Sequence, residues 1–236
     1  MNYEFINKKS VSVIVTAYNE EKNIFFFLKK LIKDLKNIDY EVIIVNDHSN
    51  DDTYKIIKNF TKKNRNIKII NNYKNLGYGG SFKKGVNLSK KNFIILLPGD
   101  GETNSRMIFK EFRSNKNYNN TLIFAWKSQN RTFLRKLLSF LYTKIINFSF
   151  NMKLKYINGP VFYNGNNLRK LNFYSKSFFF QAEILSRLSL REDFKYKEID
   201  IQYIKPKYYK SDALKFKFVI SLIKEYLIHL YRFYLK

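Results

Sequence analysis

Short apolar runs that suit buried β-strands alternate with segments of helical periodicity through the first part of this chain. Both faces of each run are apolar, so each strand is expected to be covered on both sides. This alternation predicts an α/β fold with a mostly parallel central sheet flanked by helices. The expected strands are 11–15, 42–45, 67–70 and 93–97, and the expected helices are 20–36, a segment containing Ile56, Ile57 and Phe60, and 80–88.

Polar loops follow these strands. Ligands of parallel sheets bind at the carboxyl ends of the strands, so functional residues are expected in these loops. Asn19 is the expected cap of the first helix, and Asp51 or Asp52 is the expected cap of the second. The loops are 16–20, 46–52, 75–80 and 99–104.

The second half of the chain is less regular. Residues 1–212 are interpreted as one domain, and 213–236 as a basic amphipathic helix that serves packing, dimerisation or a membrane interface. The expected elements are a strand at 122–126, an amphipathic helix at 132–150, a loop or hairpin at 158–166, a helix within 178–191, a strand at 196–204 and a helix at 214–234.

The formal net charge is +25, with 44 Lys and Arg against 19 Asp and Glu. Such a charge attracts phosphorylated substrates, anionic lipid or nucleic acid. AT-rich codons, which favour Lys and Asn, explain the excess equally well, so charge alone names no partner. The absence of cysteine excludes disulfides, thiol catalysis and Cys-based zinc sites.

No run of 18 uncharged apolar residues is present, and residues 1–10 lack the apolar core of a signal peptide. The expectation is therefore a cytoplasmic protein without a transmembrane helix, peripheral on the cytoplasmic face of the membrane. The helices expected at 132–150 and 214–234 mix apolar, aromatic and basic residues. They suit a membrane interface, ordinary packing on the sheet, or a homodimer.

Asp100 and Glu102, separated by Gly101, follow the apolar run 93–97. Two carboxylates at a strand end can share one hard cation, and Mg²⁺ or Mn²⁺ would then bridge the protein to phosphate oxygens. A solvated acidic turn is the competing interpretation, because short motifs are weak evidence on their own.

Two further loops suit a nucleotide. Asp47 comes too early to cap the next helix and can accept hydrogen bonds from a base or ribose. Gly77, Gly79 and Gly80 precede Lys84, and glycines at a helix start let the backbone approach phosphate. The spacing matches neither a P-loop nor a dinucleotide fingerprint, which argues against a kinase or a dehydrogenase.

Taken together, the segments VSVIVTAYNEEKNI, EVIIVNDHSNDDT, NLGYGGSFKKG and IILLPGDGE resemble family 2 glycosyltransferases, whose fold is the Rossmann-like GT-A fold. Downstream, FFQAEIL (179–185) and EIDIQYIKPKYYKS (198–211) resemble the branch that contains dolichol-phosphate mannose synthase. The resemblance spans residues 10 to 220 approximately, and four motifs in this order are far more specific than any one of them.

The resemblance implies a role for each matching residue. Thr16, Ala17, Tyr18, Glu20, Asp47 and Gly77 would bind the donor, with Tyr18, Glu20 and Asp47 at the base and ribose. Lys84 would face the diphosphate, Asp100 and Glu102 would hold the metal, and Glu183 would lie near the sugar or acceptor. Arg131 and Arg135 would meet an acceptor phosphate, and Lys210 and Ser211 would close over the site.

The sequence departs from the family pattern at several positions. Thr16 replaces the usual proline, and Asn46 replaces the first of two paired aspartates. The family's D-x-D-x-Q segment aligns in two ways. Either Asp100, Glu102 and Asn104 take its three places, or Pro98, Asp100 and Glu102 do. Asn104 is a metal ligand in the first alignment only.

These observations predict inverting, metal-dependent transfer of a hexose from a UDP- or GDP-linked sugar to a polyprenyl phosphate. The oxygen of such an acceptor is already anionic, so a general base is unnecessary. A hydroxyl acceptor in surface polysaccharide synthesis is the alternative, with Glu183 as the candidate base. A third hypothesis is a nucleic-acid-binding protein, but the basic residues are dispersed and base-reading motifs are lacking, so nucleic acid is not an expected partner.

Overall fold

A seven-stranded sheet runs through the centre of the computed structural model, which describes residues 9–62, 64–115, 120–127, 133–202 and 216–235. The strand order is β3-β2-β1-β4-β6-β5-β7. All neighbouring strands are parallel except β6, which is antiparallel to both β4 and β5. The strands are β1 (Ser10–Ala17), β2 (Asp39–Asn46), β3 (Ile67–Asn71), β4 (Phe93–Pro98), β5 (Thr121–Lys127), β6 (Val161–Asn164) and β7 (Tyr196–Gln202).

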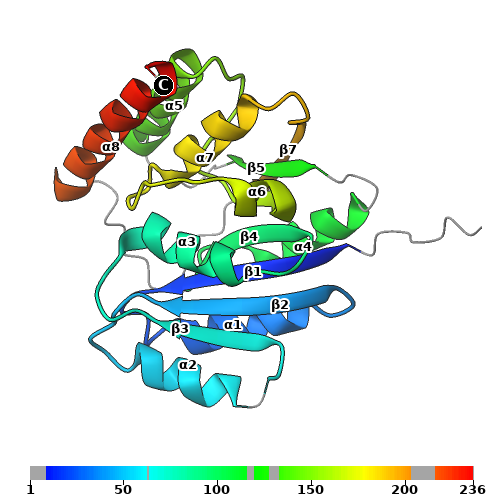
Figure 1. The fold of residues 1–236 in the computed structure, drawn as a ribbon. Coiled ribbons are helices and arrows are strands. Elements are labelled where there is room, and N and C mark those ends of the chain that lie inside the picture. Colours follow the sequence, from blue (N-terminus) through cyan, green and yellow to red (C-terminus); the bar gives the residue numbers. More distant parts are fainter. Residues whose placement is uncertain (1–8, 63, 116–119, 128–132, 203–215, 236) are drawn as a thin grey trace, which may run out of the picture.

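Helices cover both faces of this sheet (Figure 1), which confirms the predicted fold class. Alternate residues of β1 point into two separate cores, with Val13 on one face and Ile14 on the other. The face of Val13 packs against α1 (Ile24–Asp34), α2 (Thr53–Thr61) and α4 (Ser105–Ser114). The face of Ile14 packs against α3 (Gly77–Leu88), α5 (Phe133–Ser149), α6 (Gly165–Lys170), α7 (Phe180–Ser189) and α8 (Phe216–Tyr234).

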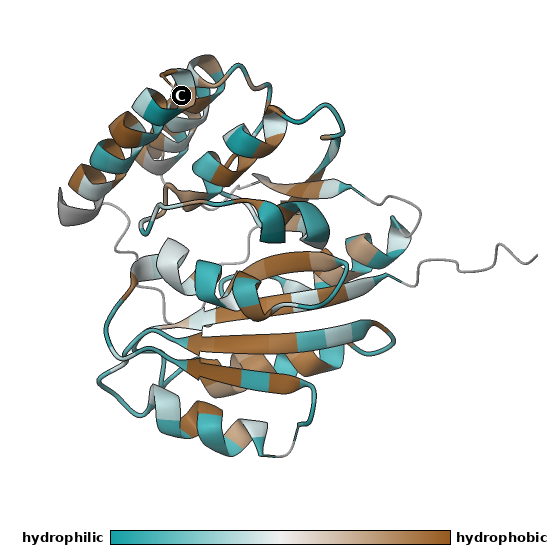
Figure 2. Cartoon of the chain, in the orientation of Figure 1, coloured by the Kyte–Doolittle hydropathy of each residue, from teal (hydrophilic) through white to brown (hydrophobic). Residues whose placement is uncertain are grey.

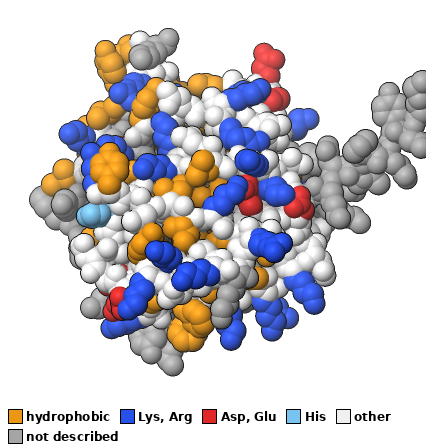
Figure 3. Space-filling view, turned by 60° about the horizontal axis from the view of Figure 1, so that its bottom comes forward, with side chains coloured by type: hydrophobic (Ala, Val, Ile, Leu, Met, Phe, Trp, Pro, Cys, Tyr) orange, Lys and Arg blue, Asp and Glu red, His pale blue; other side chains and the backbone are white. Residues whose placement is uncertain are grey.

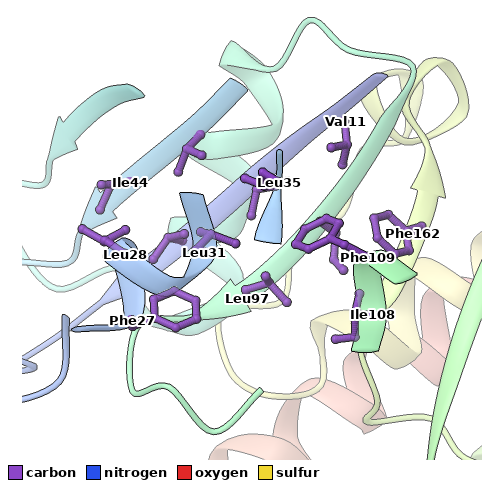
Figure 4. Packing of buried hydrophobic residues seen from close by; sticks show 14 of the residues in the cluster. Val11, Phe27, Leu28, Leu31, Leu35, Ile44, Leu97, Ile108, Phe109 and Phe162 are labelled. Carbon is purple, nitrogen blue, oxygen red and sulfur yellow. The ribbon is translucent and has the colours of Figure 1, made fainter. Parts of the chain in front are cut away.

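The central strands are the most hydrophobic part of the chain (Figure 2). In the first core, Leu28 and Leu31 of α1 point toward Ile44 and Leu97 of the sheet (Figure 4). These side chains are fully buried, and the burial of each contributes about 1.5–3 kcal/mol relative to an exposed position. Burial on both sides explains why strands β1, β2 and β4 lack the polar alternation of a half-exposed strand.

Two helices were not predicted from the sequence. Helix α4 fully buries three large apolar side chains, Ile108, Phe109 and Phe112, with Met107 partly buried against the same core, and its other residues are polar or charged. Helix α6 has six residues, which is too short to show a helical period. The segment expected to be a loop or hairpin holds strand β6, which pairs with strands far away in the sequence.

The predicted cap of the first helix was wrong. Helix α1 begins at Ile24, and Asn19 lies before it with a φ of +56°. The Asn19 Oδ1 atom accepts a hydrogen bond from the Asn50 N–H at 2.9 Å, so this side chain joins two loops. At α2, the Asp51 carboxylate accepts from the Thr53 N–H at 3.0 Å, and Asp52 makes no capping bond through its side chain.

Helices α5 and α8 lie side by side at one end of the molecule (Figure 1). The Ser149 and Tyr226 hydroxyls are 2.8 Å apart, and the Tyr234 hydroxyl donates to the Ser149 carbonyl at 2.6 Å. Among the helices that the structure describes, none has the length and apolarity needed to span a bilayer.

Replacing Phe162 with Ala is expected to destabilise the fold by about 3–5 kcal/mol. Its ring stacks on Phe112 at 4.3 Å and meets Phe109 and Phe124 at 5.8 Å, so truncation leaves a cavity under β6. Urea denaturation measures the change. Phe148→Ala is the control, because that side chain is 91% exposed. Equal destabilisation by the two variants would contradict this account of the core.

Candidate functional site

The carboxyl ends of β1, β2 and β4 meet at one edge of the sheet. Thr16 of β1 is in register with Val45 of β2 and Pro98 of β4. The Gly99 N–H donates to the Thr16 carbonyl at 2.9 Å, and the Asp47 N–H donates to the Ala17 carbonyl at 2.8 Å. The three loops predicted to carry function therefore start side by side.

Asp100 lies at this edge and is half-buried. Its Oδ1 atom accepts a hydrogen bond from the Glu102 N–H at 2.9 Å. Gly101 between them has a φ of +76°, a left-handed conformation that glycine adopts without strain. Burial raises the pKa of the Asp100 carboxyl above its ordinary value.

Glu20 belongs to the same acidic group. Burial, with smaller contributions from the Asp100 and Asp51 charges, raises the pKa of Glu20 to about 7, against a hydrogen bond from Asn23 that lowers it. Burial also raises the pKa of Tyr78, with contributions from the Asp100 and Glu102 charges. Glu20, Tyr78, Asp100 and Glu102 therefore share one electrostatic environment.

This acidic group suits a divalent cation. Carboxylate oxygens are the ligands that Mg²⁺ and Mn²⁺ prefer, and Mg²⁺ is held by one or two carboxylates with phosphate and water oxygens. Among the described side chains, no group of three or more His, Asp or Glu residues forms a metal site by itself. The residues present thus fit a metal that a ligand phosphate also binds, with Asp100 and Glu102 as the protein ligands.

Asn104 has a different role in the structure. It precedes α4, and its Oδ1 atom accepts from the Met107 N–H at 3.3 Å. This hydrogen bond is an N-terminal helix cap. The capping role explains the side chain without a metal, and so it favours the alignment in which Pro98, Asp100 and Glu102 take the three places and Asn104 is not a ligand.

The loops after β1 and β2 are joined to each other. The Glu20 N–H donates to Thr53 Oγ1 at 2.7 Å, and the Asn19 N–H donates to Ser49 Oγ at 3.0 Å. Tyr18 is exposed at the tip of the first loop. Thr16 is buried, and its hydroxyl has no hydrogen-bond partner among the described residues. A bound ligand would satisfy such a hydroxyl.

Asp47 is buried and bonded to the protein. Its carboxylate accepts from the Leu76 N–H at 2.8 Å, the Gly77 N–H at 2.9 Å and the Asn72 side-chain amide at 2.8 Å. Asp47 therefore fixes the loop that leads into α3. The structure gives it a positioning role that the sequence did not reveal.

The glycines at the start of α3 do not form the expected open cradle for phosphate. The Gly77 N–H is bound by Asp47, and the Gly79 N–H donates to the Lys176 carbonyl at 2.9 Å. A Cβ atom on Gly79 would lie 2.3 Å from the Ser175 carbonyl oxygen. These glycines instead allow the segment around Lys176 to approach the helix.

Lys84 lies on α3, and its ammonium is 5.6 Å from the centre of the Tyr73 ring. Its neighbour Lys83 donates to the Phe173 carbonyl at 2.6 Å and to the Asn172 side chain at 3.0 Å. Lys83 thus attaches α3 to the segment before α7. Lys84 does not make these bonds to residues 172 and 173.

Glu183 of α7 is 2% exposed and fully engaged with protein groups. It accepts from the Tyr174 N–H at 3.1 Å, the Ser175 N–H at 2.8 Å and the Ser175 hydroxyl at 2.6 Å. Arg187 forms an ion pair with it at 3.1 Å. These contacts position the segment before α7, and they leave the carboxylate poorly suited to act as a general base.

Four predicted acceptor residues are not placed by the structure. Arg131, Lys210 and Ser211 lie outside the described residues. Arg135 lies in α5, but its side chain is not described. Sequence analysis also missed Tyr78, although its place between two glycines at a helix start was a usable sign.

A mostly parallel sheet with carboxylates at the ends of its first and fourth strands defines a GT-A glycosyltransferase. The chain belongs to glycosyl transferase family 2, whose family model matches residues 12–178. It is similar in fold to glucosyl-3-phosphoglycerate synthase from Mycobacterium tuberculosis, solved with Mn²⁺, UDP-glucose and phosphoglyceric acid. The TM-score is 0.69 at 12% identity, covering 95% of this chain and 80% of that one.

Curated relatives include dolichyl-phosphate beta-glucosyltransferases. The protein from Trichomonas vaginalis is 32% identical over 144 residues, which are 55% of this chain and 45% of that protein. The human protein is 34% identical over 104 residues, which are 40% of this chain and 32% of that protein. The matched region thus spans less than half the length of these relatives.

Replacing Glu20 with Gln is expected to stabilise the metal-free protein near pH 8 and to change little near pH 4. Because the folded-state pKa of Glu20 is about 7, above the ordinary 4.5, the folded state binds the proton more tightly. Its contribution to stability is complete below the unfolded pKa and is lost as pH rises through 7. We expect a rise in Tm of roughly 2–4 °C at the higher pH, because solvent contact reduces the full effect.

Thermal denaturation at the two pH values measures this difference. Glu192→Gln, the same change at an exposed residue, is the control and should show no such pH dependence. An equal effect of Glu20→Gln at both pH values would contradict the assignment.

Proposed function

We propose that this chain transfers a hexose from a UDP- or GDP-linked sugar to a polyprenyl phosphate, with inversion at the sugar carbon. The observation that supports this proposal most directly is the half-buried Asp100 beside Glu102 and Glu20 at the edge where three strands end. The family membership and the fold support the donor, and solved neighbours with UDP-glucose favour that sugar nucleotide for a first test. The named dolichyl-phosphate relatives support the acceptor.

Asp100 and Glu102 would hold Mg²⁺ or Mn²⁺, which supplies positive charge to the donor diphosphate when bound. The Thr16 hydroxyl and Tyr18 would contact the donor at the ends of the first loop, and Lys84 would lie on the diphosphate side. An acceptor phosphate oxygen attacks the anomeric carbon, the bond to the diphosphate oxygen breaks, and its electron pair leaves with the nucleoside diphosphate. The protein's main task is to orient two anionic partners.

The state of Glu183 favours a phosphate acceptor over a hydroxyl. A hydroxyl acceptor needs a base, and the Glu183 carboxylate already accepts four protein hydrogen bonds or ion-pair contacts from Tyr174, Ser175 and Arg187. A phosphate oxygen needs no proton removed. We retain transfer to a glycan hydroxyl in polysaccharide synthesis as the second candidate, which the acceptor test below separates.

A nucleic-acid partner is not part of this proposal. Figure 3 shows Lys and Arg side chains spread over the visible face and interrupted by hydrophobic ones, without the single stripe expected of a nucleic-acid track. The positive charge suits phosphates of the donor, acceptor and lipid instead.

We further propose that the end of the molecule formed by α5 and α8 binds the cytoplasmic surface of an anionic membrane, with residues 213–236 as the interface element of the transferase domain 1–212. Helix α5 exposes Phe133, Leu137, Leu141, Ile145 and Phe148. Helix α8 exposes Ile220, Ile223, Leu227 and Tyr231. Lys136 and Lys144 are exposed beside the apolar residues of α5. Basic and apolar side chains together suit anionic headgroups over an acyl region.

Asp100→Asn is expected to reduce metal-stimulated transfer by about 100-fold or more, because a charge at the developing leaving group is lost. Radiolabelled transfer from UDP- and GDP-sugars measures it, with polyprenyl phosphate and an oligosaccharide as competing acceptors. A thermal shift with each donor, with and without Mn²⁺, reports donor binding separately.

Asn104→Ala is the matched variant. It should lose about 1 kcal/mol of stability as a helix cap and keep the metal response. Undiminished transfer by Asp100→Asn would contradict the metal site, and preference for the oligosaccharide would favour the second candidate.

Replacing Phe148 and Ile145 with Ser is expected to weaken binding to vesicles containing anionic lipid, by about tenfold or more, because each change removes buried apolar area. Flotation with anionic and neutral vesicles measures the binding. Phe26→Ser, at a 72% exposed position of α1, is the control. Retained binding, or a monomer–dimer change in sedimentation caused by the α5 variant, would point to a homodimer surface instead.

A further inference from the structure

Glu225 is the only acidic residue of α8, a helix otherwise rich in apolar and basic side chains. Its carboxylate is half-buried and accepts hydrogen bonds from the protein. It accepts from the Lys176 N–H at 3.0 Å, the Ser177 N–H at 3.1 Å and the Ser177 hydroxyl at 2.5 Å. The C-terminal helix therefore holds the backbone of the segment that precedes α7.

The same segment is attached on its other side to the start of α3. The Lys176 carbonyl accepts from the Gly79 N–H at 2.9 Å. A Cβ atom on Gly77 would lie 2.6 Å from that carbonyl oxygen, and one on Gly79 would lie 2.3 Å from the Ser175 carbonyl oxygen. Contacts this close leave no room for the segment to shift without moving α3.

Tyr78 lies between these two glycines and completes the connection. Its ring packs against Phe178 at 5.3 Å and Phe180 at 5.4 Å. Burial raises the pKa of its hydroxyl, and the Asp100 and Glu102 charges raise it too, which places Tyr78 within the field of those carboxylates. A continuous set of contacts thus runs from Glu225, through residues 176–178, to Tyr78 beside the acidic group.

We propose that Glu225 is a positioning residue for the donor site: by holding the segment 176–178, it sets the start of α3 and places Tyr78 beside Asp100 and Glu102. Donor affinity then depends on α8 being packed in place, although α8 contributes no side chain to the acidic group among the described residues. The identity of the ligand in this inference rests on the proposed function. The structural coupling between α8 and α3 is independent of that function.

Glu183 does not replace Glu225 in this role. Glu183 bonds residues 174 and 175 from within α7 itself, whereas Glu225 bonds residues 176 and 177 from the C-terminal helix. Each carboxylate serves different backbone N–H groups. Loss of Glu225 therefore leaves the N–H groups of Lys176 and Ser177 without their acceptor while the α7 side of the segment stays fixed.

The test uses Glu225→Gln and Glu225→Ala in the full chain, with Lys224→Ala, an exposed neighbour on α8, as the control. Hydrogen exchange of peptides covering residues 76–82 should accelerate in both Glu225 variants, because the Gly79 N–H bond to Lys176 opens more often. The Kd for UDP-glucose with Mn²⁺ should rise about tenfold in the Ala variant and less in the Gln variant, which retains one acceptor oxygen.

Unchanged exchange at 76–82 together with unchanged Kd in both variants would overturn the proposal, even if Tm fell. A loss of Tm with donor Kd preserved in the Ala variant would likewise assign Glu225 a purely structural role. If the unaltered protein binds no nucleotide sugar, the proposed function fails, while accelerated exchange at 76–82 still supports the coupling.

Discussion

The start of α3 is held by acceptors from two distant parts of the chain, and the site depends on this arrangement. Asp47 at the end of β2 binds the N–H groups of Leu76 and Gly77, and the Lys176 carbonyl binds that of Gly79. The first attachment ties the helix to β2, in the half of the sheet formed by β1, β2 and β3. The second ties it to the less regular half. The helix start thus connects the end of β2 to the part of the molecule that carries α7 and α8.

Sequence patterns predicted the first four strands because a strand buried on both faces is an almost continuous run of apolar residues. Val13 and Ile14 belong to opposite cores, and both are fully buried. Helix α4 gives a weaker sequence signal, since three fully buried apolar residues suffice to pack it against the sheet. Asn104, which caps it, is a metal-ligand candidate in one of the two sequence alignments, because an amide oxygen serves either role and the helix behind it was not predicted.

The position of the acidic loop at the sheet edge could be predicted from the sequence. The hydrogen-bond partners of the buried carboxylates could not. Asp100 follows an apolar strand, and parallel register brings that strand end beside β1. Glu183 and Glu225, by contrast, are identified only by their partners, which are backbone N–H groups of a segment without a sequence signature. Backbone donors are the same at every residue but proline, so side-chain patterns do not reveal which segment a carboxylate will hold.

The buried carboxyl groups of this chain fall into two classes, those whose pKa is lowered by their surroundings and those whose pKa is raised. Burial alone raises the pKa of Glu41, but hydrogen bonds from Lys68, Lys90 and Ser12 together bring it below its ordinary value. This carboxylate is stabilised as an anion by the protein. Burial of Glu20 and Asp100 is not offset in that way, and their pKa values are raised. Keeping such groups together costs free energy that a bound cation would recover. The pKa values of Glu20 and Asp100 stay raised despite the hydrogen bond that each accepts, so the acidic group at the strand ends is the one whose arrangement calls for a cation.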